Sequence, residues 1–149
     1  MWEGMTGTVL PYALTSAPSG WLICDGGALT SGAADVLRQK LINDGSPHGD
    51  DGSGNPLLPD LRGRVVAGVD NMGGTDAGRL TNAGTGNPGI DGDTLGAAGG
   101  ADRHALTDGE IGVVAQYGTI NEESAYKPAQ NDPHPNAQPT IVLNYIIKT

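Results

Sequence analysis

The stretch Pro56-Leu-Leu-Pro-Asp-Leu-Arg-Gly-Arg-Val-Val-Ala-Gly68 is the most distinctive part of the sequence, and it follows a glycine-rich loop. Pro59 fixes its own backbone φ angle and favours an extended Leu58, so the stretch is stiff where the loop before it is not. Residues 65–67 are rich in β-branched side chains, which favour a pleated, buried surface. The stretch therefore predicts a rigid turn that leads into a strand.

Two arginines of this stretch are expected to bind carboxylates. Arg62 and Arg64 are among only 8 Lys and Arg residues in a chain that carries 17 Asp and Glu. The planar guanidinium can hold a carboxylate through two parallel hydrogen bonds, and Asp60 is the nearest acid along the chain.

The composition favours one domain of short strands and loops. The 149 residues include 25 Gly, 10 Pro and no Phe, with 4% aromatic residues, which argues against a helical bundle. The net charge of -9 offers no basic stripe to a nucleic acid and would be repelled by an anionic membrane.

Cys24 is the single cysteine, so no disulfide can form within one chain, which fits synthesis in a reducing cytoplasm. Its neighbour Asp25 disfavours a thiolate, so we expect Cys24 and Trp21 to serve packing. Residues 1–7 lack the basic start and apolar run of a signal peptide, and no apolar run in the sequence is long enough to span a bilayer.

Three further short strands are expected. The first covers residues 8–10 and is ended by Pro11, and the second covers residues 21–24. The side chains of residues 141–148 alternate between two faces, and one of these faces is fully apolar. This is the clearest strand pattern in the sequence. A terminal strand of this kind is expected to pair within a sheet.

One amphipathic helix is expected over residues 31–45. Ser31 can cap its start, and Gly45 suits the left-handed residue after its end. Leu37 and Leu41 share a face, so the helix should lie on a sheet.

Residues 70–104 contain ten glycines and only four large apolar residues. A compact monomer rarely holds so long a segment without secondary structure of its own. We therefore expect contacts between chains to order it.

Together these features resemble the phage tail collar family, which is found in short tail fibres and in the related microcystin-dependent proteins. Four segments match its pattern in order: residues 7–11 with 18–26, residues 56–68, residues 68–75 with 95–100, and residues 136–147. The motif positions that we single out are Trp21, Pro59, Asp60, Arg62, Gly63, Arg64, Gln138 and Pro139.

The expected fold is a mixed, mainly β, tail-collar-like domain over residues 1–149, with one short α-helix and long Gly-rich irregular segments. The resemblance implies an intertwined homotrimer, in which the excursion of residues 70–104 wraps around neighbouring subunits.

The family usually carries a His-x-His pair that meets a metal on the threefold axis in short tail fibres. This chain has Ile111-Gly112-Val113-Val114 where those histidines would fall, so we expect no metal. Copies of one of the three remaining histidines, His48, His104 and His134, could gather around a threefold axis as zinc ligands, but solvent-facing loop histidines are the preferred interpretation. The acids of residues 46–55 lack the spacing of a calcium loop.

Residues 117–138 are polar and stand where longer relatives carry a receptor-binding insertion. Aromatic faces, amides and carboxylates in this tip loop have the chemistry of sugar contact, although an ordinary surface loop is the alternative. The candidate receptor-binding residues are Tyr117, Asn121, Glu122, Tyr126, Asn131 and Asp132.

No nucleophile elbow, P-loop or His-Glu-x-x-His motif occurs in the sequence, so we expect no enzymatic activity and no cofactor. The resemblance implies a structural component of a tailed bacteriophage virion, a tail-fibre or collar knob that docks on other tail proteins and takes part in host attachment. The alternative is a carbohydrate-binding adhesin at the fibre tip that reads a host surface glycan. A bacterial protein of the microcystin-dependent group is a third interpretation.

Overall fold

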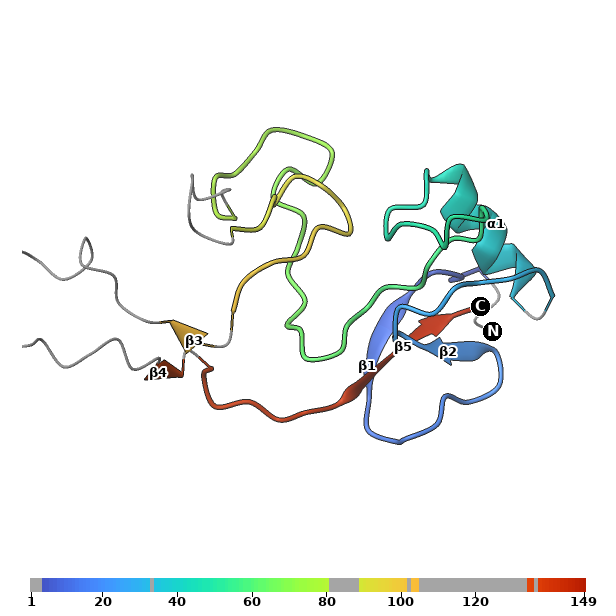
Figure 1. The fold of residues 1–149 in the computed structure, drawn as a ribbon, viewed down its shortest axis with the longest axis horizontal. Coiled ribbons are helices and arrows are strands. Elements are labelled where there is room, and N and C mark those ends of the chain that lie inside the picture. Colours follow the sequence, from blue (N-terminus) through green and yellow to red (C-terminus); the bar gives the residue numbers. More distant parts are fainter. Residues whose placement is uncertain (1–3, 33, 81–88, 102, 105–133, 136) are drawn as a thin grey trace, which may run out of the picture. The chain divides into compact units, whose positions relative to one another are not determined.

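The computed structural model describes residues 4–32, 34–80, 89–101, 103–104, 134–135 and 137–149. In chain order its elements are β1 (Val9–Tyr12), β2 (Trp21–Ile23), α1 (Asp35–Asn43), β3 (Arg103–His104), β4 (His134–Pro135) and β5 (Asn144–Lys148) (Figure 1). They fall into two compact units, one of residues 1–99 with 141–149 and one of residues 100–140. The described residues confirm the predicted class of short strands, irregular segments and one short helix.

The first unit is built on a three-stranded antiparallel sheet with the order β1-β5-β2. The C-terminal strand is therefore central, with Val9 opposite Ile147 on one side and Ile23 opposite Ile146 on the other. This confirms that the terminal strand is tied into a sheet. The consecutive residues Ile146 and Ile147 are only 4% and 2% exposed, so β5 is buried on both faces at this point.

The strand predicted over residues 141–148 begins later, at Asn144. On one side, pairing with β1 starts at the Tyr12–Asn144 position, after which the chain of β1 bends away. On the other side, the last hydrogen bond between β5 and the chain of β2 is donated by the Cys24 N–H to the Tyr145 carbonyl oxygen at 2.9 Å. Residues 141–143 therefore have no neighbouring strand in the described part of the chain.

Pro11 does not end the first strand, as the sequence predicted, but lies inside β1 opposite Tyr145. The position is compatible with proline because β1 is an edge strand of the sheet. An edge strand tolerates a residue without an N–H when that position faces away from the neighbouring strand.

Helix α1 is shorter than predicted at its start and agrees with the prediction at its end. Ser31 does not cap it, because Ala34 is the N-cap residue and makes no side-chain hydrogen bond. Instead, the Asp35 carboxylate accepts a hydrogen bond from the Gly32 N–H at 2.7 Å.

At the C-terminus of α1, Gly45 adopts a φ of 79°. Its N–H donates to the Ile42 carbonyl, and the Ser46 N–H donates to the Leu41 carbonyl at 2.8 Å. These two bonds form a Schellman motif, which satisfies carbonyl groups that the last turn would otherwise leave open.

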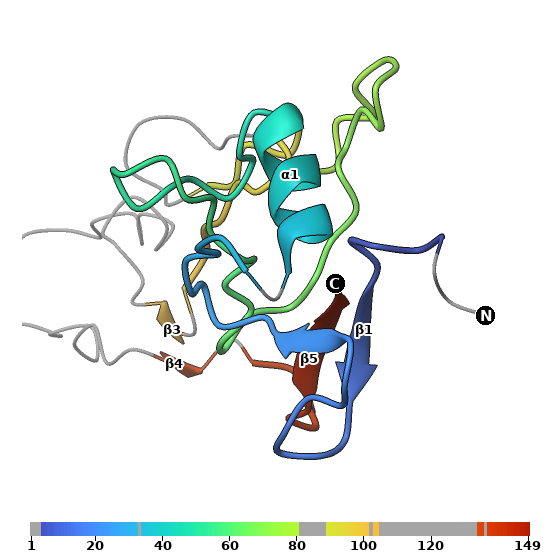
Figure 2. The ribbon, with the colours of Figure 1, turned by 90° about the vertical axis from the view of Figure 1, so that its right-hand side faces the viewer.

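The core lies between α1 and the sheet, and Figure 2 shows the helix on one side of the three strands. Leu37 of α1 is 1% exposed and packs with Cys24, which is 2% exposed, and with Ile147. The packing role predicted for Cys24 is therefore confirmed, whereas Trp21 is only half-buried in β2.

Residues 65–67 do not form the predicted buried strand. They have no regular secondary structure and no strand partner in the described part, and Val65 and Val66 are 78% and 52% exposed. A β-branched run becomes a strand only where a neighbouring strand or packed face receives it, and the described residues provide neither.

Hydrogen bonds of Asp70, through both its carboxylate and its backbone, connect the described parts of the Gly-rich segment. The Asp70 carboxylate accepts hydrogen bonds from the Arg79 and Leu80 N–H groups at 2.8 and 3.3 Å. The Asp70 N–H in turn donates to the Gly92 carbonyl at 2.7 Å, which connects residues 70–80 with residues 89–99. Asp and Asn residues are well suited to such local turns, so this segment has order of its own that its apolar content does not indicate.

Candidate functional site

The stretch from Pro56 to Arg64 runs antiparallel to the chain that follows β2. Isolated bridges join Ala28 to Leu57 and Asp25 to Asp60. Backbone bonds of 2.9 Å run from the Leu58 N–H to the Gly27 carbonyl, and likewise from the Leu29 N–H to the Pro56 carbonyl. These backbone bonds hold the stretch against the chain that follows β2, and Pro56 and Leu58 are buried there.

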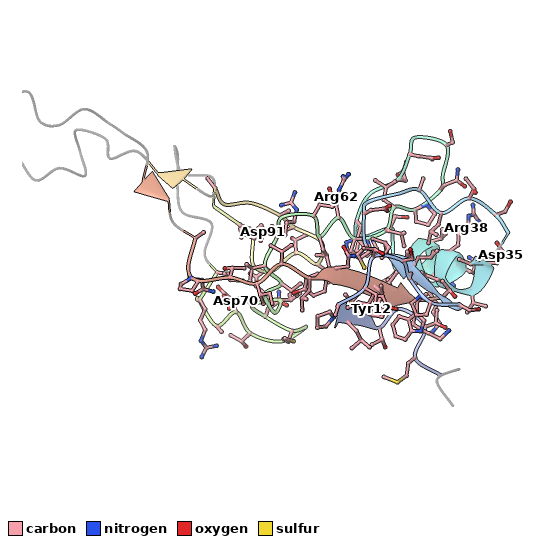
Figure 3. All side chains as sticks on the ribbon, turned by 90° about the horizontal axis from the view of Figure 1, so that it is seen from below. Tyr12, Asp35, Arg38, Arg62, Asp70 and Asp91 are labelled. Atoms are coloured by element: carbon pink, nitrogen blue, oxygen red, sulfur yellow. The ribbon has the colours of Figure 1, made fainter. Side chains whose placement is uncertain are left out.

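Asp60 and Arg62 form the two-bond pair that the sequence predicted. Arg62 Nε and Nη2 donate to the two Asp60 carboxylate oxygens at 2.7 and 2.9 Å, and the Arg62 backbone N–H donates at 3.3 Å. The Arg62 guanidinium lowers the pKa of Asp60 to about 2. The pair is exposed, and Figure 3 shows Arg62 directed outward, so its main effect is to fix the turn rather than to add much stability.

Arg64 was also expected to bind a carboxylate, but it makes no ion pair within the described residues. Its backbone N–H donates to the Leu61 carbonyl at 3.2 Å, and its side chain is exposed. The guanidinium is near enough to contribute to the lowered pKa of Asp60 after the larger effect of Arg62. Arg64 therefore offers a cation at the surface of the motif.

An open pocket of about 260 Å³ lies beside the pair, and His48, Leu57, Asp60, Arg62 and Arg64 contribute to its walls. Burial lowers the pKa of His48, although the charge of Asp44 acts in the opposite direction, so the imidazole is neutral at pH 7. The pocket combines neutral, charged and apolar groups and has no arrangement that indicates a reaction.

Cys24 is directly beneath this motif, since the Leu61 N–H donates to its carbonyl oxygen at 3.1 Å. Burial, followed by the nearby Asp25 charge, raises the pKa of the Cys24 thiol to about 11. The thiol is therefore neutral and shielded at pH 7, as expected for a packing residue.

The loop acids that sequence analysis considered for calcium bind their own backbone. Asp51 accepts hydrogen bonds from the Ser53 and Asn55 N–H groups and from the Asn55 side chain, at 2.8 to 3.1 Å. The Asp50 carboxylate accepts from the Gly52 N–H at 2.7 Å. Among the described residues, no group of three or more His, Cys, Asp or Glu could hold a metal ion.

Sequence reasoning did not place His134 beside any other segment, and in the second unit its backbone pairs with residues 103–104. Strands β3 and β4 are antiparallel, with His104 and His134 at the same register position. Nothing in the local sequence indicates this pairing, because about thirty residues separate the two positions along the chain. Residues 111–114, where the family's histidine pair would fall, lie outside the described residues.

The candidate receptor-binding residues also lie outside the described residues, so their arrangement stays a prediction. Gln138 and Pro139 are exposed, and the Gln138 carbonyl accepts a hydrogen bond from the Thr140 hydroxyl at 2.7 Å. The structure brings Asp60, Arg62, Gly63 and Arg64 together in one turn, which places the motif residues of the middle segment at a common surface.

A family model, Phage Tail Collar Domain, matches residues 7–66. This confirms the predicted resemblance over β1, β2, α1 and the stretch that carries the Asp60–Arg62 pair. The other segments that we compared with the family, at residues 68–75, 95–100 and 136–147, lie outside the matched range. Residues 7–66 are therefore similar to a domain of phage tails.

A search of curated proteins finds no match to the chain. Within the part that the structure describes, no helix has the length and apolar character needed to cross a membrane.

Proposed function

We propose that the chain is a non-enzymatic structural component of a tailed bacteriophage virion, a tail-fibre or collar knob that docks on other tail proteins. The observation that carries this proposal is the collar match, which falls on the residues that form β1, β2, α1 and the Asp60–Arg62 turn. On this proposal, residues 1–149 form one tail-collar-like domain with a Gly-rich excursion and a polar tip loop.

The knob is an intertwined homotrimer in this proposal. Its support is the number of large apolar side chains left at the surface of the first unit, among them Val65, Met72 and Val142 at 78%, 78% and 90% exposure. Runs of consecutive exposed apolar residues, such as residues 65–66 and 141–143, are more informative than single ones, because contiguous apolar surface is typical of regions that another protein covers. In a trimer, neighbouring chains would cover these exposed side chains, although the core within each chain is small.

The solution mass from light scattering, measured with and without a chelator, tests the trimer. We expect three times the chain mass of 15.1 kDa in both conditions. A monomer would contradict the trimer, and a trimer lost on chelation would assign the histidines to a shared metal site. Binding to purified tail components, with no affinity for host cells, would support a purely structural role.

A role in host attachment is the second proposal, through the tip loop of residues 117–138. It is favoured by the side-chain chemistry of that loop, in which Tyr117 and Tyr126 offer aromatic faces for sugar rings. Labelled protein should then decorate host cells, and the double variant Tyr117→Ala and Tyr126→Ala should lose this binding while keeping its oligomeric state. Unchanged decoration would refute the assignment of the loop.

A further inference from the structure

The segment of residues 141–143 lies directly before the central strand of the sheet, where that strand has no neighbour in the described part of the chain. Ile141, Val142 and Leu143 are 81%, 90% and 41% exposed, directly before the buried part of β5. Asn144 marks the boundary, since its side-chain amide donates to the Leu14 carbonyl at 2.9 Å and so fixes the bend after β1. No backbone hydrogen bond within the described residues uses residues 141–143.

A second segment of the same unit has the same properties. Residues 65–67 follow the Asp60–Arg62 turn without regular secondary structure, and their backbone groups make no hydrogen bond within the described residues. Both Val65 and Val66 are more than half exposed. The turn before them is held by the Arg64 N–H, which donates to the Leu61 carbonyl, so this segment leaves a fixed point.

These two segments have the chemistry of strands that lack a partner. Both are short and apolar, with β-branched residues that favour a pleated surface. An extended segment with open N–H and C=O groups binds another extended segment by strand addition, in which backbone bonds give affinity and alternate side chains give specificity. The two segments do not pair with each other within one chain.

The charge distribution favours a second copy as the partner. Two copies of a chain with a net charge of -9 repel each other, so contact is least unfavourable where acids are absent. Residues 61–69 contain Arg62 and Arg64 and no acid, and residues 134–149 contain Lys148 and no acid. Each copy also carries one segment of each kind, so every unpaired segment of one copy has a possible partner in another copy.

We propose that residues 141–143 of one copy pair as an added strand with residues 65–67 of a neighbouring copy. This inference rests on the trimer of the proposed function and names the surfaces that form it. Because the two segments differ, the contact is head-to-tail, and repeating it around a threefold axis leaves no segment open. The central strand of each sheet then extends into the next copy.

Engineered cysteines in the full chain test the pairing directly. Two forms with different affinity tags are co-expressed, one with Val142→Cys and the other with Val65→Cys or Val66→Cys, so that both faces of residues 65–67 are sampled. The native Cys24 stays in place because it is 2% exposed. Mild oxidation should give a disulfide-linked dimer that contains both tags, since a disulfide needs Cα atoms about 4.4–6.8 Å apart.

The matched control replaces Val36, which is 62% exposed on α1 and lies outside both segments. Co-expression of Val36→Cys with Val142→Cys should give no linked dimer. Linkage of Val142→Cys with itself, at the expense of the mixed product, would overturn the head-to-tail arrangement. A trimer by light scattering with no mixed disulfide at either position would overturn this inference alone, whereas a monomer would overturn the proposed trimer as well.

Discussion

Gly26 lies so close to Asp60 that a side chain at this position would crowd it. A Cβ atom built on Gly26 lies 3.0 Å from the Asp60 Cβ and 3.3 Å from its Cγ. Gly26 also adopts a φ of 76°, and its N–H donates to the Pro59 carbonyl at 3.3 Å. The close approach of the motif to the end of β2 therefore depends on a glycine at this turn.

Replacing Gly26 by alanine should destabilise the first unit more than the same change at Gly63. Gly63 has a φ of 66°, and no atom lies within 4 Å of a Cβ built on it. Alanine at this position therefore costs only the backbone strain of the left-handed conformation. That effect is about 1–2 kcal/mol for a left-handed residue. Thermal unfolding of both variants measures the difference, with about 2–4 °C expected for each kcal/mol. Equal shifts would show that the contact with Asp60 has no role.

Leu37→Ala should destabilise the chain by about 2–5 kcal/mol, because it opens a cavity between α1 and the sheet. Leu37 is 1% exposed, whereas its neighbour Val36 is 62% exposed on the same helix. Val36→Ala is the matched control and should stay within about 0.5 kcal/mol of the native chain. Urea unfolding of the two variants measures both values. A small effect of Leu37→Ala would mean that α1 does not pack on the sheet in solution.

The Asp60–Arg62 pair should lose its contribution to stability in acid. Its folded pKa of about 2 lies below the ordinary value of 3.8, so the contribution is complete above about pH 4 and disappears as the pH falls through the folded value. The urea midpoints of the native chain and of Arg62→Gln should therefore differ by a small amount at neutral pH and converge near the folded pKa. Lys40→Gln removes the same charge from α1 and should show no such convergence.

The Cys24 thiol should make the fold sensitive to alkali. Its pKa is raised from 9.0 to about 11, so the protonated thiol contributes stability that is complete below pH 9 and lost as the pH rises through the folded value. The decrease in urea midpoint across this window should be smaller in Cys24→Ala. At about pH 8, a thiol reagent should label the native chain far more slowly than the urea-unfolded chain. Rapid labelling of the native chain would place Cys24 outside the core.

The sequence predicts elements whose signals are local. Gly45 at the end of α1, the Leu37 face and the Asp60–Arg62 pair all depend on residues a few positions apart, and the structure contains each of them. The start of α1 was misjudged because Ser31 is a good N-cap type but the Asp35 carboxylate binds the Gly32 N–H instead.

What the sequence did not indicate depends on distant neighbours. Residues 65–67 and 141–143 have strand propensity, but propensity alone does not supply a partner strand, and the described residues contain none for them. The pairing of the Pro56–Asp60 region with residues 25–29 is likewise a contact between segments that the chain separates by a helix and a loop. Such contacts follow from the fold and leave no period or motif in the sequence.

A charge at Val142 should break the oligomer if residues 141–143 lie between copies. Val142→Arg adds a guanidinium where the native side chain is 90% exposed in one chain and would be buried in the trimer. An unpaired buried charge is strongly unfavourable, so the solution mass should fall toward that of a single chain while the circular dichroism of the first unit is kept. Val36→Arg places the same charge on α1 and should leave the mass unchanged. If both variants remain trimeric, the trimer contact lies elsewhere on the surface, because a packed strand pair could not accommodate arginine at this position without losing its apolar contacts.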